Sequence, residues 1–122
     1  MNEQQRKLVN YFEKQIADCK RRSELLAADD RMDEANIEKV RANIYDIFKT
    51  ILSAAEKVCG EDDIAKKRFF LQKAEQIPES WSAAYEHAKK HEDVEKMLVE
   101  STKLDTIQEI KDTFLQVWEE FI

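Results

Sequence analysis

The sequence contains only one glycine and one proline, Gly60 and Pro78, in 122 residues. Phosphate-binding loops and dinucleotide-binding fingerprints each need several glycines, so neither motif exists in this chain. Enzymes place many of their catalytic groups on loops, and loops are rich in glycine and proline. We therefore expect a protein that is not an enzyme, with no catalytic residues and no cofactor.

Long hydrophobic runs are also missing. Every apolar run is far shorter than the roughly 20 residues that a membrane-spanning helix needs. The first five residues, Met1–Gln5, are polar and lead directly into a periodic segment, unlike a secretory signal peptide. The sequence therefore predicts a cytoplasmic protein that does not act at a membrane.

Basic residues are scarce in the second half of the chain. Residues 1–60 carry 11 basic and 11 acidic side chains, whereas residues 61–122 carry 9 and 15, which accounts for the whole net charge of -6. This balance argues against nucleic-acid binding, because proteins that bind DNA or RNA neutralise its phosphates. It fits a charged surface that keeps the protein soluble, a basic protein partner, or an acidic mimic that inhibits a nucleic-acid-binding protein.

Apolar residues spaced three and four positions apart are abundant, and this spacing marks one face of an α-helix. They form two regular seams, in about residues 2–28 and 32–59: Val9, Phe12, Ile16, Cys19, Ser23 and Leu26, then Ile37, Val40, Ile44, Ile47, Ile51, Ala54 and Val58. The very short connection predicts a long antiparallel helical hairpin, with facing residues whose numbers sum to about 60. Gly60 ends the second helix.

The two cysteines are expected to be reduced. In the predicted hairpin Cys19 lies beside Arg41, and Cys59 is then about 27 Å further along the helix at ~1.5 Å per residue. A disulfide needs Cα atoms no more than about 7 Å apart. Cys19 is on the apolar seam and has no histidine in its segment, so we interpret it as a core residue and not a nucleophile.

After Gly60 the sequence predicts three or four shorter helices packed on the hairpin, so that residues 1–122 form a single all-α helical-bundle domain. The first of them has a predicted buried stripe of Ile64, Phe70, Leu71, Ala74 and Ile77. Pro78 ends this helix and begins the next. The apolar phase slips near residues 89–93, which predicts a break, and then resumes at Val94, Met97, Leu98 and Leu104. A capping-box pattern from Thr106 to Glu109 predicts a second, weaker break.

Two features resemble binding motifs but have simpler explanations. His87 and His91 are four residues apart and could face one metal ion, with Glu95 extending the row, but no cysteine lies nearby. We interpret them as solvated histidines and predict no metal site. The basic clusters at residues 20–22 and 66–68 are flanked by acidic residues, as is common on helix surfaces.

Aromatic residues gather in the second half of the chain, and aromatic side chains are enriched at interface hot spots. The interface candidates are Phe69, Trp81, Tyr85, Trp118 and Phe121. Our first hypothesis is a helical bundle that acts through protein–protein contacts and self-associates, for example as a homodimer. A second hypothesis is a small-molecule or metal-binding bundle whose pocket is lined by Trp81, Tyr85, His87 and His91.

Overall fold

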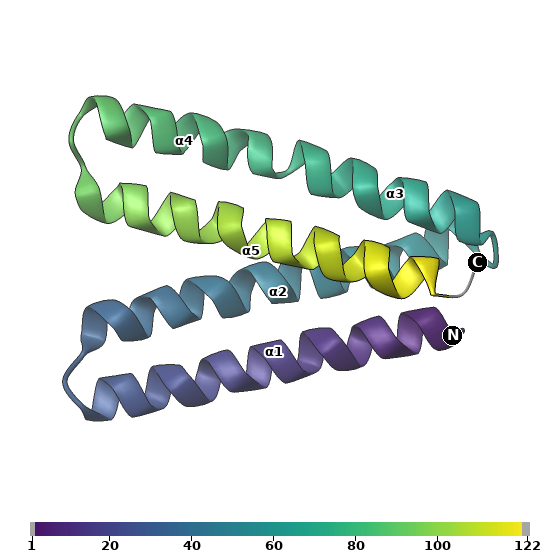
Figure 1. Cartoon of the computed structure of the whole chain (residues 1–122), viewed down its shortest axis with the longest axis horizontal. Helices are drawn as coiled ribbons and strands as arrows, with labels where there is room; N and C mark the ends of the chain where they lie inside the picture. Colours follow the sequence, from purple (N-terminus) through teal and green to yellow (C-terminus); the bar gives the residue numbers. More distant parts are fainter. Residues whose placement is uncertain (1, 121–122) are drawn as a thin grey trace.

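The computed structural model describes residues 2–120, and all regular structure in this part of the chain is helical. The helices are α1 (Glu3–Ala28), α2 (Met32–Cys59), α3 (Asp63–Gln76), α4 (Pro78–Lys90) and α5 (Val94–Glu119). They pack side by side as an elongated bundle (Figure 1). The predicted all-α helical bundle is therefore confirmed. None of the helices within residues 2–120 combines the length and the apolar character needed to cross a membrane.

Helices α1 and α2 form the predicted antiparallel hairpin (Figure 1). Its register is fixed by polar contacts along the pair: Arg22 with Glu38 at 3.2 Å, Glu13 with Lys49 at 3.3 Å, and Ser23 Oγ donating to the Ala35 carbonyl at 3.1 Å. The two residue numbers of each pair sum to between 58 and 62. The predicted register is thus confirmed to within one helical turn.

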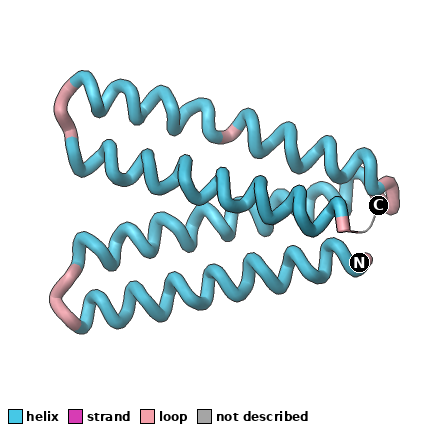
Figure 2. The backbone as a smooth tube through the Cα atoms, in the orientation of Figure 1, coloured by secondary structure: helices cyan, strands magenta, loops and turns pink. Residues whose placement is uncertain are grey.

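Helices α3 and α4 follow each other end to end as one arm, with a short interruption where they meet (Figure 2). Pro78 is the first residue of α4, as predicted, and its ring nitrogen has no hydrogen to continue the helical ladder. The Ile77 amide still bonds to the Lys73 carbonyl at 3.0 Å, so the helix is regular up to the proline. The arm packs antiparallel to α5, and α3 also contacts α2.

The core is built around a column of aromatic rings from three helices. Phe48 of α2 meets Phe70 of α3 edge-on at 5.9 Å between ring centroids. Phe70 then stacks on Phe114 of α5 at 4.1 Å, and Phe114 stacks on Trp118 at 5.0 Å. Each such aromatic pair contributes about 0.5–1.5 kcal/mol beyond the area it buries. We call these four residues the aromatic column.

The fold differs from the sequence-based expectation in α5, which continues through Asp105 and Thr106 without a break. Thr106 does not cap a helix: its Oγ1 donates to the Thr102 carbonyl one turn earlier, at 2.7 Å. Threonine makes this bond readily inside a helix, so its presence does not by itself mark a helix start. The prediction of a second break was wrong, and α5, with 26 residues, is as long as α1. The predicted break near residues 89–93 is confirmed, because α4 ends at Lys90.

The buried face of α3 also differs from the prediction at its first turn. Ile64 is exposed, whereas Lys66 is buried. The Lys66 ammonium lies 3.3 Å from Oε1 of Gln5 in α1 and 3.7 Å from Oδ1 of Asp63 in α3, so both helices provide it with a partner. Buried charges are tolerated when they are paired in this way. The interaction joins the beginnings of α1 and α3.

Candidate functional site

Helices α2 and α5 run in the same direction and diverge toward the end of the bundle at which both begin (Figure 1). Farther along, Glu109 of α5 joins the two helices to α1, because Tyr45 Oη donates to its Oε2 at 2.7 Å and Tyr11 Oη donates to its Oε1 at 3.2 Å. Burial raises the pKa of Tyr11 to about 12 and also raises the pKa of Tyr45. Both phenols therefore remain hydrogen-bond donors at neutral pH.

A groove with a volume of about 430 Å³ lies between the first turns of α2 and α5. Five aliphatic side chains line it: Ile37 and Val40 from α2, and Val94, Leu98 and Val99 from α5. Asp33, Asn36 and Glu95 are its polar residues. We call this site the α2–α5 groove.

The apolar lining of the groove is unusually open to solvent. Val94 is 73% exposed and Leu98 is 53% exposed, whereas Ile37, Val40 and Val99 are half-buried beside them. Single apolar side chains on a surface are common, but a contiguous apolar hollow bordered by polar residues marks a binding site more often. Val94 and Leu98 were predicted to resume the apolar stripe of the helices, and both are exposed in the structure.

The charges that line the groove are all negative. Asp33 and Glu95 are exposed, and neither makes an ion pair with any residue between 2 and 120. Both belong to the first turn of their helix, where the helix dipole stabilises a carboxylate. None of the described residues that line the groove is basic, so these two carboxylates give its lining a negative charge.

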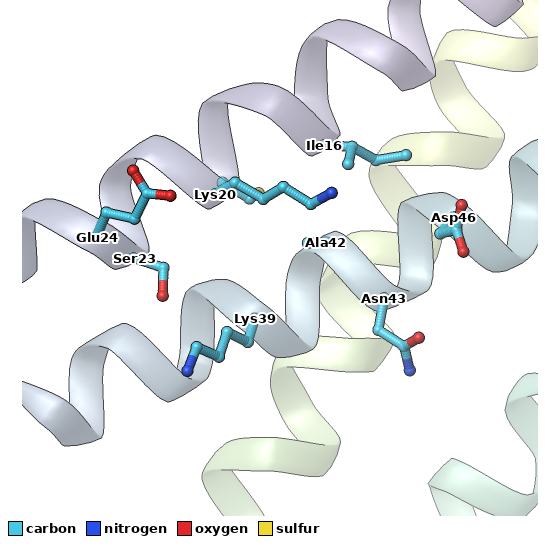
Figure 3. Close-up of a pocket in the computed structure, with 9 residues that line it drawn as sticks. Ile16, Lys20, Ser23, Glu24, Lys39, Ala42, Asn43 and Asp46 are labelled. Atoms are coloured by element: carbon cyan, nitrogen blue, oxygen red, sulfur yellow. The ribbon is translucent and has the colours of Figure 1, made fainter. Parts of the chain in front are cut away.

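A second hollow, of about 470 Å³, lies between α1 and α2 (Figure 3). Ile16, Cys19 and Ala42 form its apolar part, and Lys20 extends between the two helices beside them. Its other lining residues are polar: Ser23 and Asn43 are uncharged, Glu24 and Asp46 are negative, and Lys39 is positive. Because opposite charges lie on both walls, this hollow has no consistent preference for a ligand of one sign.

Cys19 borders this second hollow, but its thiol is fully buried. Burial, together with the nearby Glu38 carboxylate, raises the pKa of the Cys19 thiol, although Arg22 Nη2 lies 3.4 Å from Sγ. Both Cys19 and Cys59 are free thiols, as expected, and Cys59 is half-buried at the end of α2. A thiol that is buried and protonated reacts slowly, because the thiolate is the nucleophile.

We expect iodoacetamide at pH 8 to alkylate Cys59 at least about 10-fold faster than Cys19, because only the Cys59 thiol is accessible to solvent and reagent. Mass spectrometry of proteolytic peptides taken over time would give both rates. The Cys59→Ser variant should react slowly throughout, and denaturant should make the two thiols equally reactive. Rapid alkylation of Cys19 in the folded protein would contradict its burial.

Three of the aromatic interface candidates lie partly at the surface but outside the α2–α5 groove. Phe69 is half-buried, with the Lys73 ammonium 5.6 Å from its ring centroid. Trp81 is half-buried and packs against the core, with Lys103 5.9 Å from its ring centroid. Tyr85 is half-buried on α4. None of the three lines either hollow.

The other two candidates differ in status. Trp118 is only 2% exposed and belongs to the aromatic column, so it is a core residue and not a surface available to a partner. Composition alone could not separate these roles, because tryptophan is common in both cores and interfaces. Phe121 lies outside the described residues.

The histidines do not form a recognisable metal site. The rings of His87 and His91 are 4.4 Å apart, and both residues are exposed. Within residues 2–120 no group of three or more His, Cys, Asp or Glu side chains is arranged to hold a metal ion.

One carboxylate of α5 is buried away from the groove. Glu100 is 6% exposed, its Oε1 lies 3.2 Å from Lys103 Nζ, and its Oε2 has no hydrogen-bond partner among the described residues. Lys103 also contacts the Trp81 ring, so the same ammonium connects this carboxylate to α4. The arrangement holds α4 against α5.

The apolar surface that sequence reasoning missed is aliphatic. The exposed large hydrophobic residues in the described part of the chain are Leu25, Met32, Val58, Ile64, Val94 and Leu98. Among these six, Val94 and Leu98 lie together in a groove. Comparison of the chain with protein-family models, with curated proteins and with solved structures found no match. Function therefore has to be inferred from the groove itself.

Proposed function

We propose that this protein is a non-enzymatic interaction module that binds a protein partner in the α2–α5 groove. The observation that carries the proposal is the exposure of Val94 and Leu98 inside an apolar hollow. Covering Leu98 and its neighbours would remove apolar surface from water, which contributes about 25 cal/mol for each Å² buried. The chain gains this energy only when something occupies the groove.

The groove is better suited to a protein than to a small molecule. Small-molecule sites enclose most of the ligand and aim several polar groups at it. Here the lining is largely aliphatic and open, and its polar residues are Asp33, Asn36 and Glu95. The hypothesis of a pocket lined by Trp81 and the histidines gains no support, since none of these side chains lines either hollow.

The acidic-mimic hypothesis is also supported less well. Such a mimic needs a contiguous acidic face, but carboxylates of the second half are interspersed with basic partners. Glu75 pairs with Lys111, and Glu120 lies 2.6 Å from Lys7. Pairing of this kind reduces the field that a basic binding site would recognise.

Photo-crosslinking in the native cell tests the proposal. A photoreactive amino acid placed at Val94 or Leu98 should give a covalent adduct of defined mass with a partner protein. The matched control is Ile64, which is equally exposed at 73% but lies in the first turn of α3, outside the groove. An adduct formed equally well from position 64, or none from positions 94 and 98, would refute the groove as the binding site.

A substitution in the groove should remove the adduct without unfolding the protein. Leu98→Asn, combined with the photoreactive group at position 94, should reduce the adduct strongly because it removes an apolar side chain from the α5 wall of the groove. The exposed side chain contributes little to folding, so the free energy of unfolding should change by less than about 1 kcal/mol. Ile64→Asn is the matched control and should leave the adduct unchanged.

A further inference from the structure

From the walls and the charge of the α2–α5 groove, we infer that its occupant is a basic amphipathic α-helix of another protein. This inference rests on the proposed function and adds the class of partner. Three features carry it: the dimensions of the groove, the lack of free backbone groups along its walls, and its two carboxylates.

The dimensions suit a short helical segment. The α2 wall extends from Asp33 to Val40 and the α5 wall from Val94 to Val99, about 10 Å and 8 Å at ~1.5 Å per residue. The α2 wall is therefore about two helical turns long and the α5 wall about one and a half. On α2 the lining residues are spaced three and four apart, as in a helix–helix contact. A third helix of two to three turns can place its apolar face between them.

The walls offer nothing to an extended peptide. Both are helices, and beyond the first turn their backbone groups are bonded within the helix. An extended segment in an apolar groove would leave its own backbone groups without partners, unless a sheet edge were available to pair with them. Residues 2–120 contain no strand, and no aromatic side chain lines the groove to hold a polyproline segment. A helix satisfies its own backbone and needs only an apolar face.

The charges of the groove select a basic helix. Asp33 and Glu95 lie on opposite walls, and the lining residues within the described part of the chain include no lysine, arginine or histidine. Lysine or arginine residues flanking the apolar face of the occupant would meet both carboxylates. Complementary charges of this kind mainly set specificity and the rate of association.

A second copy of this chain fits the groove less well. In a two-fold dimer the same patch meets itself, so Asp33 and Glu95 of each copy would be brought together without a cation between them. Like charges placed opposite each other disfavour association. Self-association through this groove is therefore an alternative that the experiment must exclude.

The test uses two synthetic 18-residue helical peptides with leucines at the same positions, one carrying lysines on its polar face and one glutamates. Titration into isotopically labelled protein, followed by NMR, gives both the affinity and the site. The lysine peptide should shift the signals of Val40, Val94 and Leu98 and bind at least about 10-fold more tightly than the glutamate peptide. Its affinity should fall as salt is added.

The double variant Asp33→Asn, Glu95→Gln should weaken the lysine peptide about 5-fold, since each exposed pair contributes modestly. The matched control is Glu79→Gln, Glu86→Gln, which removes two exposed carboxylates from α4 and should leave the affinity unchanged. Thermal unfolding of both variants would show whether the substitutions at the first helical turns also lower the stability of the protein.

The outcomes separate the inference from the proposed function. Equal binding of the two peptides, binding of neither, or adducts at position 94 only with the chain itself would overturn the basic helix as occupant. If position 94 still gave an adduct with another protein, the interaction module would stand. If that adduct were absent too, both proposals would fail.

Discussion

Replacing Phe114 with alanine should lower the free energy of unfolding by about 4 kcal/mol. Phe114 is fully buried in the middle of the aromatic column, stacked on Phe70 at 4.1 Å and on Trp118 at 5.0 Å. Removing its ring leaves a cavity between α3 and α5, and the flat rings on either side cannot both move to fill it. Domains of this size are stable by roughly 5–15 kcal/mol, so a large part of the total would be lost. Urea unfolding followed by circular dichroism measures the change.

The matched control for this substitution is Phe69→Ala, at the residue that precedes Phe70 of the aromatic column in the sequence. Phe69 is half-buried, and its ring contacts the Lys73 ammonium at the surface. We expect a cost of about 1 kcal/mol or less, because little apolar area is lost and no enclosed cavity forms. Equal costs for the two substitutions would show that the aromatic column is not the centre of the core.

Placing proline at Asp105 should destabilise the protein by at least about 3 kcal/mol. Asp105 is exposed in the middle of α5, so the substitution disturbs no buried side chain. The proline removes one bond of the helical ladder and its ring clashes with the carbonyl four residues earlier. This cost arises only if α5 is continuous at this position, as the structure has it. Thermal and urea unfolding provide the measurement.

Val94→Pro supplies the contrast, because Val94 is the first residue of the same helix. Proline is favoured at this position, where the backbone amide has no partner within the helix. The preceding residue, Asp93, is already outside the α region, which a following proline disfavours, with φ -83° and ψ 86°. We expect a change of less than about 1 kcal/mol. If Asp105→Pro were equally harmless, the helix would have to be interrupted near Thr106 after all.

The hairpin of α1 and α2 was predictable in detail, and the reason is local. Regular apolar spacing, a connection of three residues and the terminating Gly60 leave one arrangement for two helices of similar length. The register then follows from the lengths, and the contact of Arg22 with Glu38 has the pairing expected. No information from distant parts of the chain was needed.

The errors occurred where the outcome depends on tertiary contacts. The pattern of Thr106 followed by Glu109 occurs both at the start of a helix and in the interior of one, as in α5. The two cases cannot be distinguished from the local sequence, and contacts with the neighbouring helices decide between them. At the first turn of α3, Lys66 is buried in place of Ile64 because Gln5, distant in sequence, supplies a hydrogen-bond acceptor.

The groove residues were hidden by the same ambiguity. Val94 and Leu98 have the spacing of a core stripe, and a face that awaits a partner has the same periodicity as a face covered by the chain itself. What exposes them is the divergence of α5 from α2, which no local pattern encodes. Helix α5 has more apolar residues than a single buried face can contain, and it carries them on several sides. This excess is the sequence signal that could have indicated an exposed apolar surface on α5.

Helix α4, which begins at Pro78, contacts only part of the bundle. Within residues 2–120, α4 touches α5 and α3 but neither α1 nor α2. The α5 wall of the groove is therefore supported from behind by α4, which does not reach the α1–α2 hairpin, while the aromatic column joins α2, α3 and α5. None of the residues that line the groove belongs to the aromatic column, so substitutions in the groove leave the stacked rings unchanged in composition. We therefore expect substitutions in the groove to change the fit to a partner, and substitutions in the aromatic column to change the resistance to unfolding, largely independently of each other.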